Sequence, residues 1–163
     1  MDEIPVEKRF GILCKITRAQ HFAWRAAVAE LCPGVDTPAV VDRMWELTGV
    51  GTGEAYQGRL DLDRPLAPQI AESIVWSSQC MGEDAAVETG EGDEAFVVHA
   101  DCPWVHWHRK LGLLPEDRPG CDAWFQSTLD TVNAARGTKV RFETLESLPE
   151  GGSCCRRRIW AER

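Results

Sequence analysis

The sequence lacks any apolar run approaching the roughly 18–20 residues that a membrane-spanning helix needs. Residues 1–5 are acidic and contain no apolar signal core, so we expect a cytoplasmic protein. The sequence also lacks an excess of positive charge. Its 18 lysines and arginines are outnumbered by 26 aspartates and glutamates, so the net charge is −8. A chain this acidic repels phosphate backbones. Neither nucleic acid nor membrane is therefore a predicted partner.

No two cysteines are spaced as Cys-x-x-Cys, and this excludes a standard zinc finger or ribbon. Seven cysteines are an odd number in a chain with no predicted export signal, so we expect reduced thiols. Clustered reduced thiols favour metal binding or catalysis over disulfides. Four of the seven lie in the last 62 residues: Cys102, Cys121, Cys154 and Cys155.

The first half of the chain is predicted to be helical. A helix over residues 6–31 is indicated by Phe10, Leu13, Trp24 and Leu31, which recur at helical spacing. A second helix is expected to start at Asp36-Thr37-Pro38, and a third spans residues 66–81.

Three glycines, Gly49, Gly51 and Gly53, follow the predicted second helix, which runs from about Pro38 to Leu47. No lysine follows them and no strand precedes them, so a phosphate-binding loop is disfavoured. We interpret them as a helix break or hinge.

Alternating segments in the second half predict strands. Two hairpins are expected, from residues 84–89 with 94–100 and from 138–145 with 153–160, and two helices separate them at 104–111 and 121–136. Residues 114–120 are predicted to be a loop. Hairpins indicate an α+β fold, in which the N-terminal helices pack with a small antiparallel sheet. A single domain over residues 1–163 is expected, with a helical part at about 6–81 and a cysteine-bearing part at about 84–162.

The cysteines of the second half lie where predicted elements begin or end, and loops at such places assemble sites. A helix opening at Cys121 would lower the pKa of its thiol. On period-two alternation Cys155 shares a face with Arg157 and Ile159, so either Cys154 or Cys155, and not both, faces a common centre. The alternative interpretation is that Cys102 and Cys121 are buried and inert.

Four segments carry a family resemblance: Cys102-Pro103, Cys121-Asp122, Arg141-Phe142-Glu143-Thr144-Leu145 and Gly151-Gly152-Ser153-Cys154-Cys155-Arg156. They resemble the L-2-amino-thiazoline-4-carboxylic acid hydrolase-like family over about the last 60 residues. That family is distantly similar to vinyl-reductase-type small-molecule-binding domains, whose cysteines can hold zinc. The resemblance implies a hydrolase or lyase that opens a C–N bond of a cyclic amidine. The alternative that it implies is a vinyl-reductase-like ligand-binding or metal-handling domain with no hydrolytic activity.

Site roles follow from this resemblance. Cys102 and Cys121 would act as nucleophile, or hold zinc or another thiophilic metal together with Cys154 or Cys155. Protons would be transferred by His99, His106 or His108. Substrate would be bound by Trp104, Arg109 and Arg156, while Asp122 is expected to cap its helix. The expected partner is a small-molecule substrate or ligand, and a homo-oligomer is allowed.

Overall fold

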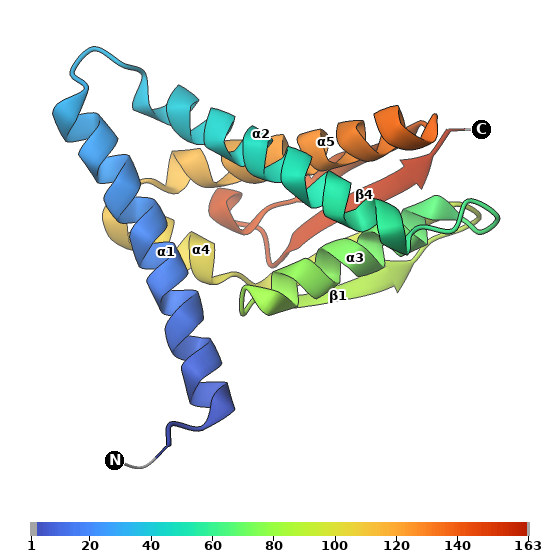
Figure 1. Ribbon diagram of the computed structural model, residues 1–163, viewed down its shortest axis with the longest axis horizontal. Coiled ribbons are helices and arrows are strands. Elements are labelled where there is room, and N and C mark those ends of the chain that lie inside the picture. The colour runs from blue at the N-terminus through green and yellow to red at the C-terminus, as the bar shows by residue number, and fades with distance from the viewer. Residues whose placement is uncertain (1–2, 163) are drawn as a thin grey trace. The chain divides into compact units, whose positions relative to one another are not determined.

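The computed structural model describes residues 3–162, and the chain divides into two compact units, Met1–Val41 and Asp42–Arg163. The first unit contains α1 (Val6–Leu31) and the start of α2 (Thr37–Tyr56) (Figure 1). Asp36 begins α2 as expected, because its Oδ1 accepts the Ala39 N–H at 3.3 Å. The expectation of a single domain stays a prediction.

The second unit is a four-stranded antiparallel sheet with helices, and it confirms the α+β fold class. Its strands lie in the order β1-β2-β4-β3, so each predicted hairpin is present and β2 pairs with β4. After α2 its elements are η1 (Gln57–Arg59), α3 (Leu66–Cys80), β1 (Asp84–Thr89), β2 (Glu94–Asp101), α4 (Pro103–Leu111), α5 (Leu114–Arg136), β3 (Val140–Glu146), η2 (Leu148–Glu150) and β4 (Cys155–Ala161).

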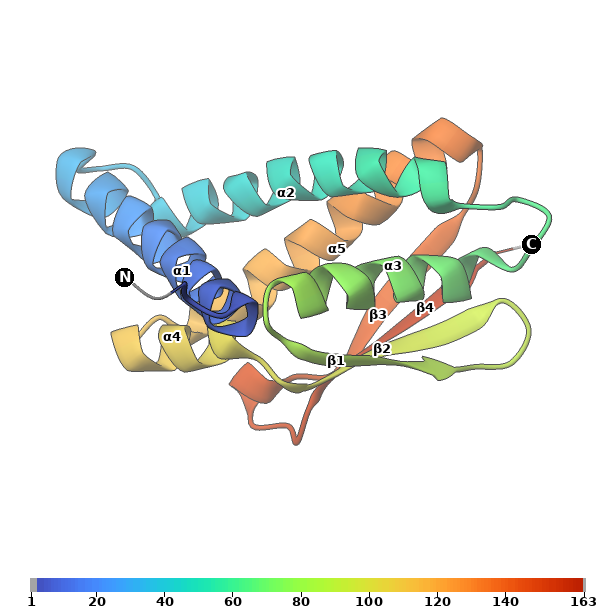
Figure 2. The same cartoon turned by 60° about the horizontal axis from the view of Figure 1, so that its bottom comes forward.

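The core lies between this sheet and two helices. Figure 2 shows α3 and α5 on the same side of the sheet. Ile70 and Ile74 of α3 and Leu129 of α5 are fully buried there, together with Val97 and Ile159 from the strands. Burial along β4 alternates as the period-two pattern predicts. Cys155 and Arg157 are therefore buried at one edge of this core.

The predicted hinge in α2 is wrong, because the helix continues through all three glycines to Tyr56. Two of these glycines allow close packing instead. A Cβ at Gly49 would lie 2.6 Å from the Trp124 carbonyl oxygen, and one at Gly53 would lie 2.7 Å from that of Thr128. The glycines therefore let α5 approach the backbone of α2.

The predicted loop at residues 114–120 is wrong too, because α5 already begins at Leu114. Pro115, at the second position, costs little because the first N–H groups of a helix have no intrahelical partner, whereas Pro119 lies inside the helix and removes one hydrogen bond. Cys121 is consequently the eighth residue of α5 rather than its first, and Asp122 does not cap the helix. The argument that a helix dipole lowers the pKa of Cys121 therefore fails.

Candidate functional site

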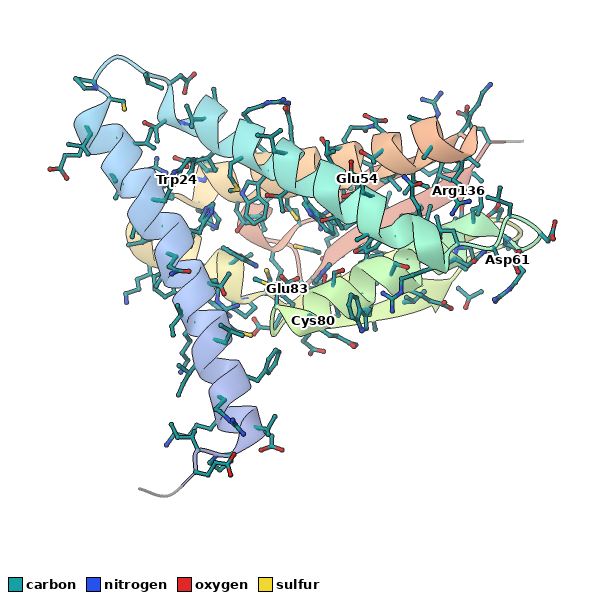
Figure 3. All side chains as sticks on the ribbon, in the orientation of Figure 1. Trp24, Glu54, Asp61, Cys80, Glu83 and Arg136 are labelled. Carbon is teal, nitrogen blue, oxygen red and sulfur yellow. The ribbon has the colours of Figure 1, made fainter. Side chains whose placement is uncertain are left out.

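A buried polar cluster joins the end of α3 to β2 and α4, near Glu83, which Figure 3 labels beside Cys80. The Trp104 indole N–H donates to Glu83 Oε1 at 3.0 Å. The other carboxylate oxygen lies 3.2 Å from Nε2 of His99, a side chain that is 4% exposed. Ser78 Oγ lies 2.9 Å from the same nitrogen. Both the hydroxyl and the carboxylate therefore approach Nε2, whereas a catalytic triad needs them on opposite ring nitrogens.

The surroundings of all four C-terminal thiols favour the neutral form. Burial raises the pKa of Cys121 to about 12. Burial, and then the nearby Glu83, raises the pKa of Cys102 well above its usual range. The pKa values of Cys154 and Cys155 are also raised, chiefly by burial. A thiolate is the form that attacks or binds metal, so these surroundings disfavour both roles.

The predicted zinc site is wrong. Within residues 3–162 there is no group of three or more histidine, cysteine, aspartate or glutamate side chains that could hold a metal ion. Cys155 points inward and its Sγ accepts the Leu148 N–H at 3.3 Å, while Cys154 contacts Glu146 at 3.6 Å. The two neighbouring cysteines thus face different surroundings, as the alternation predicted.

The histidines of α4 also diverge, because residues two apart on a helix do not share a face. His106 is exposed and its Nε2 lies 2.6 Å from Asp101 Oδ1. His108 is buried, and its Nδ1 lies 2.7 Å from Asp117 Oδ2. The catalytic roles predicted for Cys102, Cys121, His99 and His106 stay untested predictions.

Arg157 is the main polar residue that the sequence reasoning left without a role. Its side chain is 2% exposed, and its guanidinium carbon lies 4.6 Å from the ring centroid of Phe125. Asp122 Oδ1 lies 3.2 Å from Arg157 Nη2 and also accepts the Thr144 hydroxyl at 2.8 Å. Its burial could have been predicted from the period-two alternation of β4, which placed Arg157 between two apolar positions of that strand.

The side chains predicted to bind substrate do not gather around Arg157. Arg156 lies on the opposite face of β4, above the Phe96 ring and paired with Glu88. Arg109 is exposed on α4. Trp104 lies in the Glu83 cluster, so the three side chains have separate surroundings. Their substrate-binding roles stay predictions.

Thiol alkylation should follow burial. With iodoacetamide at pH 7.5 we expect the exposed Cys32 and Cys80 to react first. Cys121 should react at least about 100-fold more slowly, because a raised pKa lowers its thiolate fraction. Peptide mapping by mass spectrometry measures each rate, and the unfolded chain in guanidinium serves as the control. Equal rates for Cys80 and Cys121 in the folded protein would contradict the partial burial of Cys121 against the core.

A second candidate site is the surface of α1, which carries an exposed apolar stripe of Val6, Phe10, Leu13, Trp24 and Leu31. Their exposed fractions are 65, 43, 60, 41 and 75%. The spacings of 4, 3, 11 and 7 residues keep these side chains on one side of the helix. A stripe with this period normally packs against another apolar surface. No helix within residues 3–162 has the length and apolarity to cross a membrane.

Comparisons with known proteins identify a fold. No family model matches the chain, and no curated protein matches it. A solved structure is similar, the trafficking protein particle complex subunit 3 from Naegleria fowleri covalently bound to palmitic acid, with a TM-score of 0.58 and 14% identity. The match covers 94% of this chain and 97% of that one. At this identity the likeness shows the fold.

This comparison corrects the predicted function. The chain resembles a trafficking subunit in structure, so the expectation of a C–N hydrolase or lyase, or of a vinyl-reductase-like domain, is wrong. The described residues contain no group of side chains that could hold a metal ion. The zinc chemistry that was expected with the hydrolase activity is therefore unsupported as well. The resemblance of the last 60 residues to the amino-thiazoline hydrolase-like family stays a prediction, because no finding bears on it.

Proposed function

We propose that this chain is a subunit of a multiprotein assembly with a trafficking role, acting in the cytoplasm. The exposed apolar stripe of α1 carries the proposal. Its fold supports the proposal, because a subunit of a trafficking complex shares it over nearly the whole chain. The stripe is the surface through which this subunit binds another protein.

The amount of apolar surface on α1 supports a protein partner. Seven large hydrophobic side chains of this helix are exposed, namely the five of the stripe and, beside the stripe, Ile12 and Ile16. A helix of 26 residues is about 39 Å long, so the stripe can fill a long groove. Contiguous apolar surface of this kind marks an interaction site when it is larger than a few hundred Å².

The charge of α1 defines the partner further. The helix has five basic residues and two acidic ones, although the whole chain has a net charge of −8. Lys8 and Lys15 are exposed near the N-terminal half of the stripe. A groove with an apolar floor and acidic rims would complement this surface, and binding should weaken as salt screens the charges.

The double substitution Phe10→Glu with Leu13→Glu tests the proposal. It places two charges in the stripe and removes two apolar anchors, each worth about 1.5–3 kcal/mol when buried. In tagged chain purified from its own cells at native expression, we expect at least about tenfold less of the bound partner. Quantitative mass spectrometry of the co-purified proteins measures the loss.

Ala19→Glu with Ala26→Glu is the matched control, because it adds the same charge on exposed positions away from the stripe. This variant should keep the partner, and circular dichroism should show equal helix content in all three proteins. If the stripe binds a second copy, the purified chain sediments as a dimer that Phe10→Glu with Leu13→Glu dissociates. Equal partner recovery from both variants, or a wild-type chain that is monomeric and carries nothing, would refute the proposal.

A further inference from the structure

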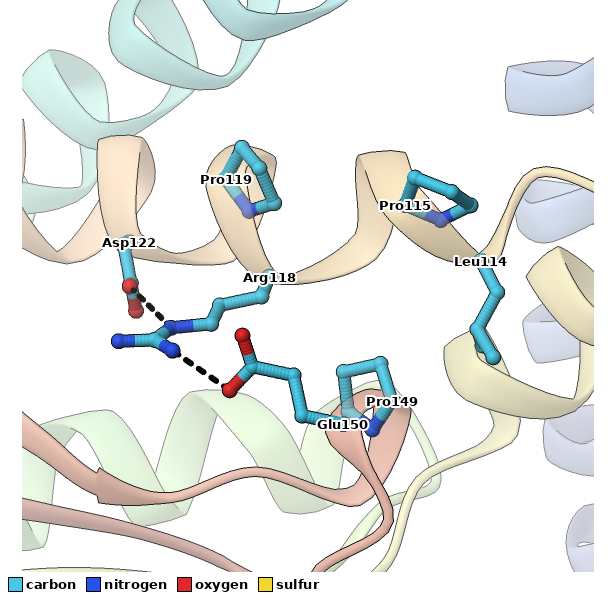
Figure 4. A pocket seen from close by; sticks show the side chains of 7 residues that line it. All are labelled: Leu114, Pro115, Arg118, Pro119, Asp122, Pro149 and Glu150. Atoms are coloured by element: carbon cyan, nitrogen blue, oxygen red, sulfur yellow. Dashed lines mark hydrogen bonds and ion pairs between the residues drawn. The ribbon is translucent and has the colours of Figure 1, made fainter.

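A pocket of about 400 Å³ lies between the first two turns of α5 and η2 (Figure 4). Its volume is in the range of small-molecule sites. Three prolines, Pro115, Pro119 and Pro149, form its walls together with Leu114. Proline rings have little freedom to move, so the apolar walls are preformed. The positive end of the 23-residue α5 dipole adjoins the pocket and favours a negative group there.

Arg118 provides the polar centre of this pocket. Figure 4 shows it between two carboxylates. Its Nε lies 3.2 Å from Asp122 Oδ2, and its Nη1 lies 2.5 Å from Glu150 Oε2. Within residues 3–162 its Nη2 has no hydrogen-bond partner. The Arg118 side chain is 37% exposed and therefore accessible from solvent. It offers a planar pair of N–H groups of the kind that binds a carboxylate in two places.

The two carboxylates on Arg118 are held very differently. Asp122 is anchored from the protein interior by Arg157 and Thr144. Glu150 is 55% exposed and, among the described residues, its side chain has Arg118 as its partner. An exposed ion pair of this kind contributes little to stability, because solvent screens the two charges. Glu150 is thus an exchangeable carboxylate in a preformed anion position.

We propose that this pocket binds a small monocarboxylic acid with a compact apolar body, whose carboxylate replaces that of Glu150 on Arg118. The exchange keeps the number of carboxylates paired with Arg118 unchanged. Without it, an incoming anion would meet two carboxylates around a single exposed guanidinium. The apolar body of the ligand then lies against the prolines and Leu114. This site is independent of α1 and of the Glu83 cluster.

The test is a titration of the ¹⁵N-labelled full-length chain with 4-phenylbutyrate, followed by amide chemical shifts. Shifts are expected at residues 114–122 and 147–152. Glu150→Gln removes the competing charge and should tighten binding about two- to fivefold. Arg118→Gln should weaken it at least about tenfold. The neutral analogue 4-phenylbutan-1-ol should bind at least about tenfold more weakly than the acid.

Arg109→Gln, at an exposed arginine of α4, is the matched control and should leave the Kd unchanged. Each variant is first checked for an unchanged fold by its amide spectrum. The proposal is overturned if Glu150→Gln binds the acid no more tightly than the wild type, or if the alcohol binds as well as the acid. Chemical-shift changes confined to other parts of the chain would overturn it as well. So would the absence of acid binding by both the wild type and Glu150→Gln.

Discussion

Asp122→Ala is expected to lower the free energy of unfolding by about 3–5 kcal/mol, because it leaves a buried guanidinium without its carboxylate. Arg157 is 2% exposed, and Asp122 is the carboxylate that pairs with it. Cys121 and Cys155 cannot replace this charge, since burial raises the pKa of both thiols. Thr144 also loses its hydrogen-bond acceptor. Denaturation with guanidinium chloride, followed by circular dichroism, measures the change.

The cost should come from the unpaired charge rather than from the lost volume. Adding Arg157→Met to Asp122→Ala removes that charge, so the double variant should be about 1–3 kcal/mol more stable than Asp122→Ala alone. Glu150→Gln is the control, because it removes the other, exposed carboxylate on Arg118 and should cost less than about 1 kcal/mol. A double variant no more stable than Asp122→Ala would show that the pair is not what stabilises this part of the core.

Hydrophobic period explains why much of the fold could be predicted. The helix expected at residues 6–31 is α1, and both predicted hairpins form because alternation and turn residues act locally. The start of α5 was missed because Pro119 and Gly120 are local signals of a loop. A Cβ at Gly120 would lie 2.6 Å from Trp45, so this glycine serves a contact between distant segments. The spacing of hydrophobic residues along the sequence gives no information about such a contact.

The candidate sites could be predicted only in part, for a related reason. Alternation placed Cys155 and Arg157 on one face of β4, but Asp122, the partner of Arg157, is 35 residues away in the chain. The apolar period of α1 was visible, yet a period shows that a stripe needs a covering surface and not which molecule provides it. The thiol chemistry failed because burial, which raises the pKa of Cys121, is set by tertiary packing.

Gly49→Ala and Gly53→Ala are each expected to destabilise the protein by about 1–3 kcal/mol, although alanine is the better helix former. The new Cβ would lie 2.6 or 2.7 Å from a backbone carbonyl oxygen of α5, which cannot rotate away as a side chain can. Separating α2 from α5 would also lengthen the hydrogen bond from Thr128 Oγ1 to the Gly49 carbonyl, now 3.2 Å. Thermal and chemical unfolding measure the loss.

Gly51→Ala is the matched control in the same helix, where an added Cβ has nothing within 4 Å. Here no steric clash opposes the lower backbone freedom of alanine in the unfolded chain, so this variant should stabilise the protein by about 0.5–1 kcal/mol. Two substitutions of identical chemistry, two residues apart, should therefore change stability in opposite directions. A stabilising effect at all three glycines would mean that α2 and α5 are not in close backbone contact. A loss at all three would contradict the open space around Gly51, where an added Cβ meets nothing within 4 Å.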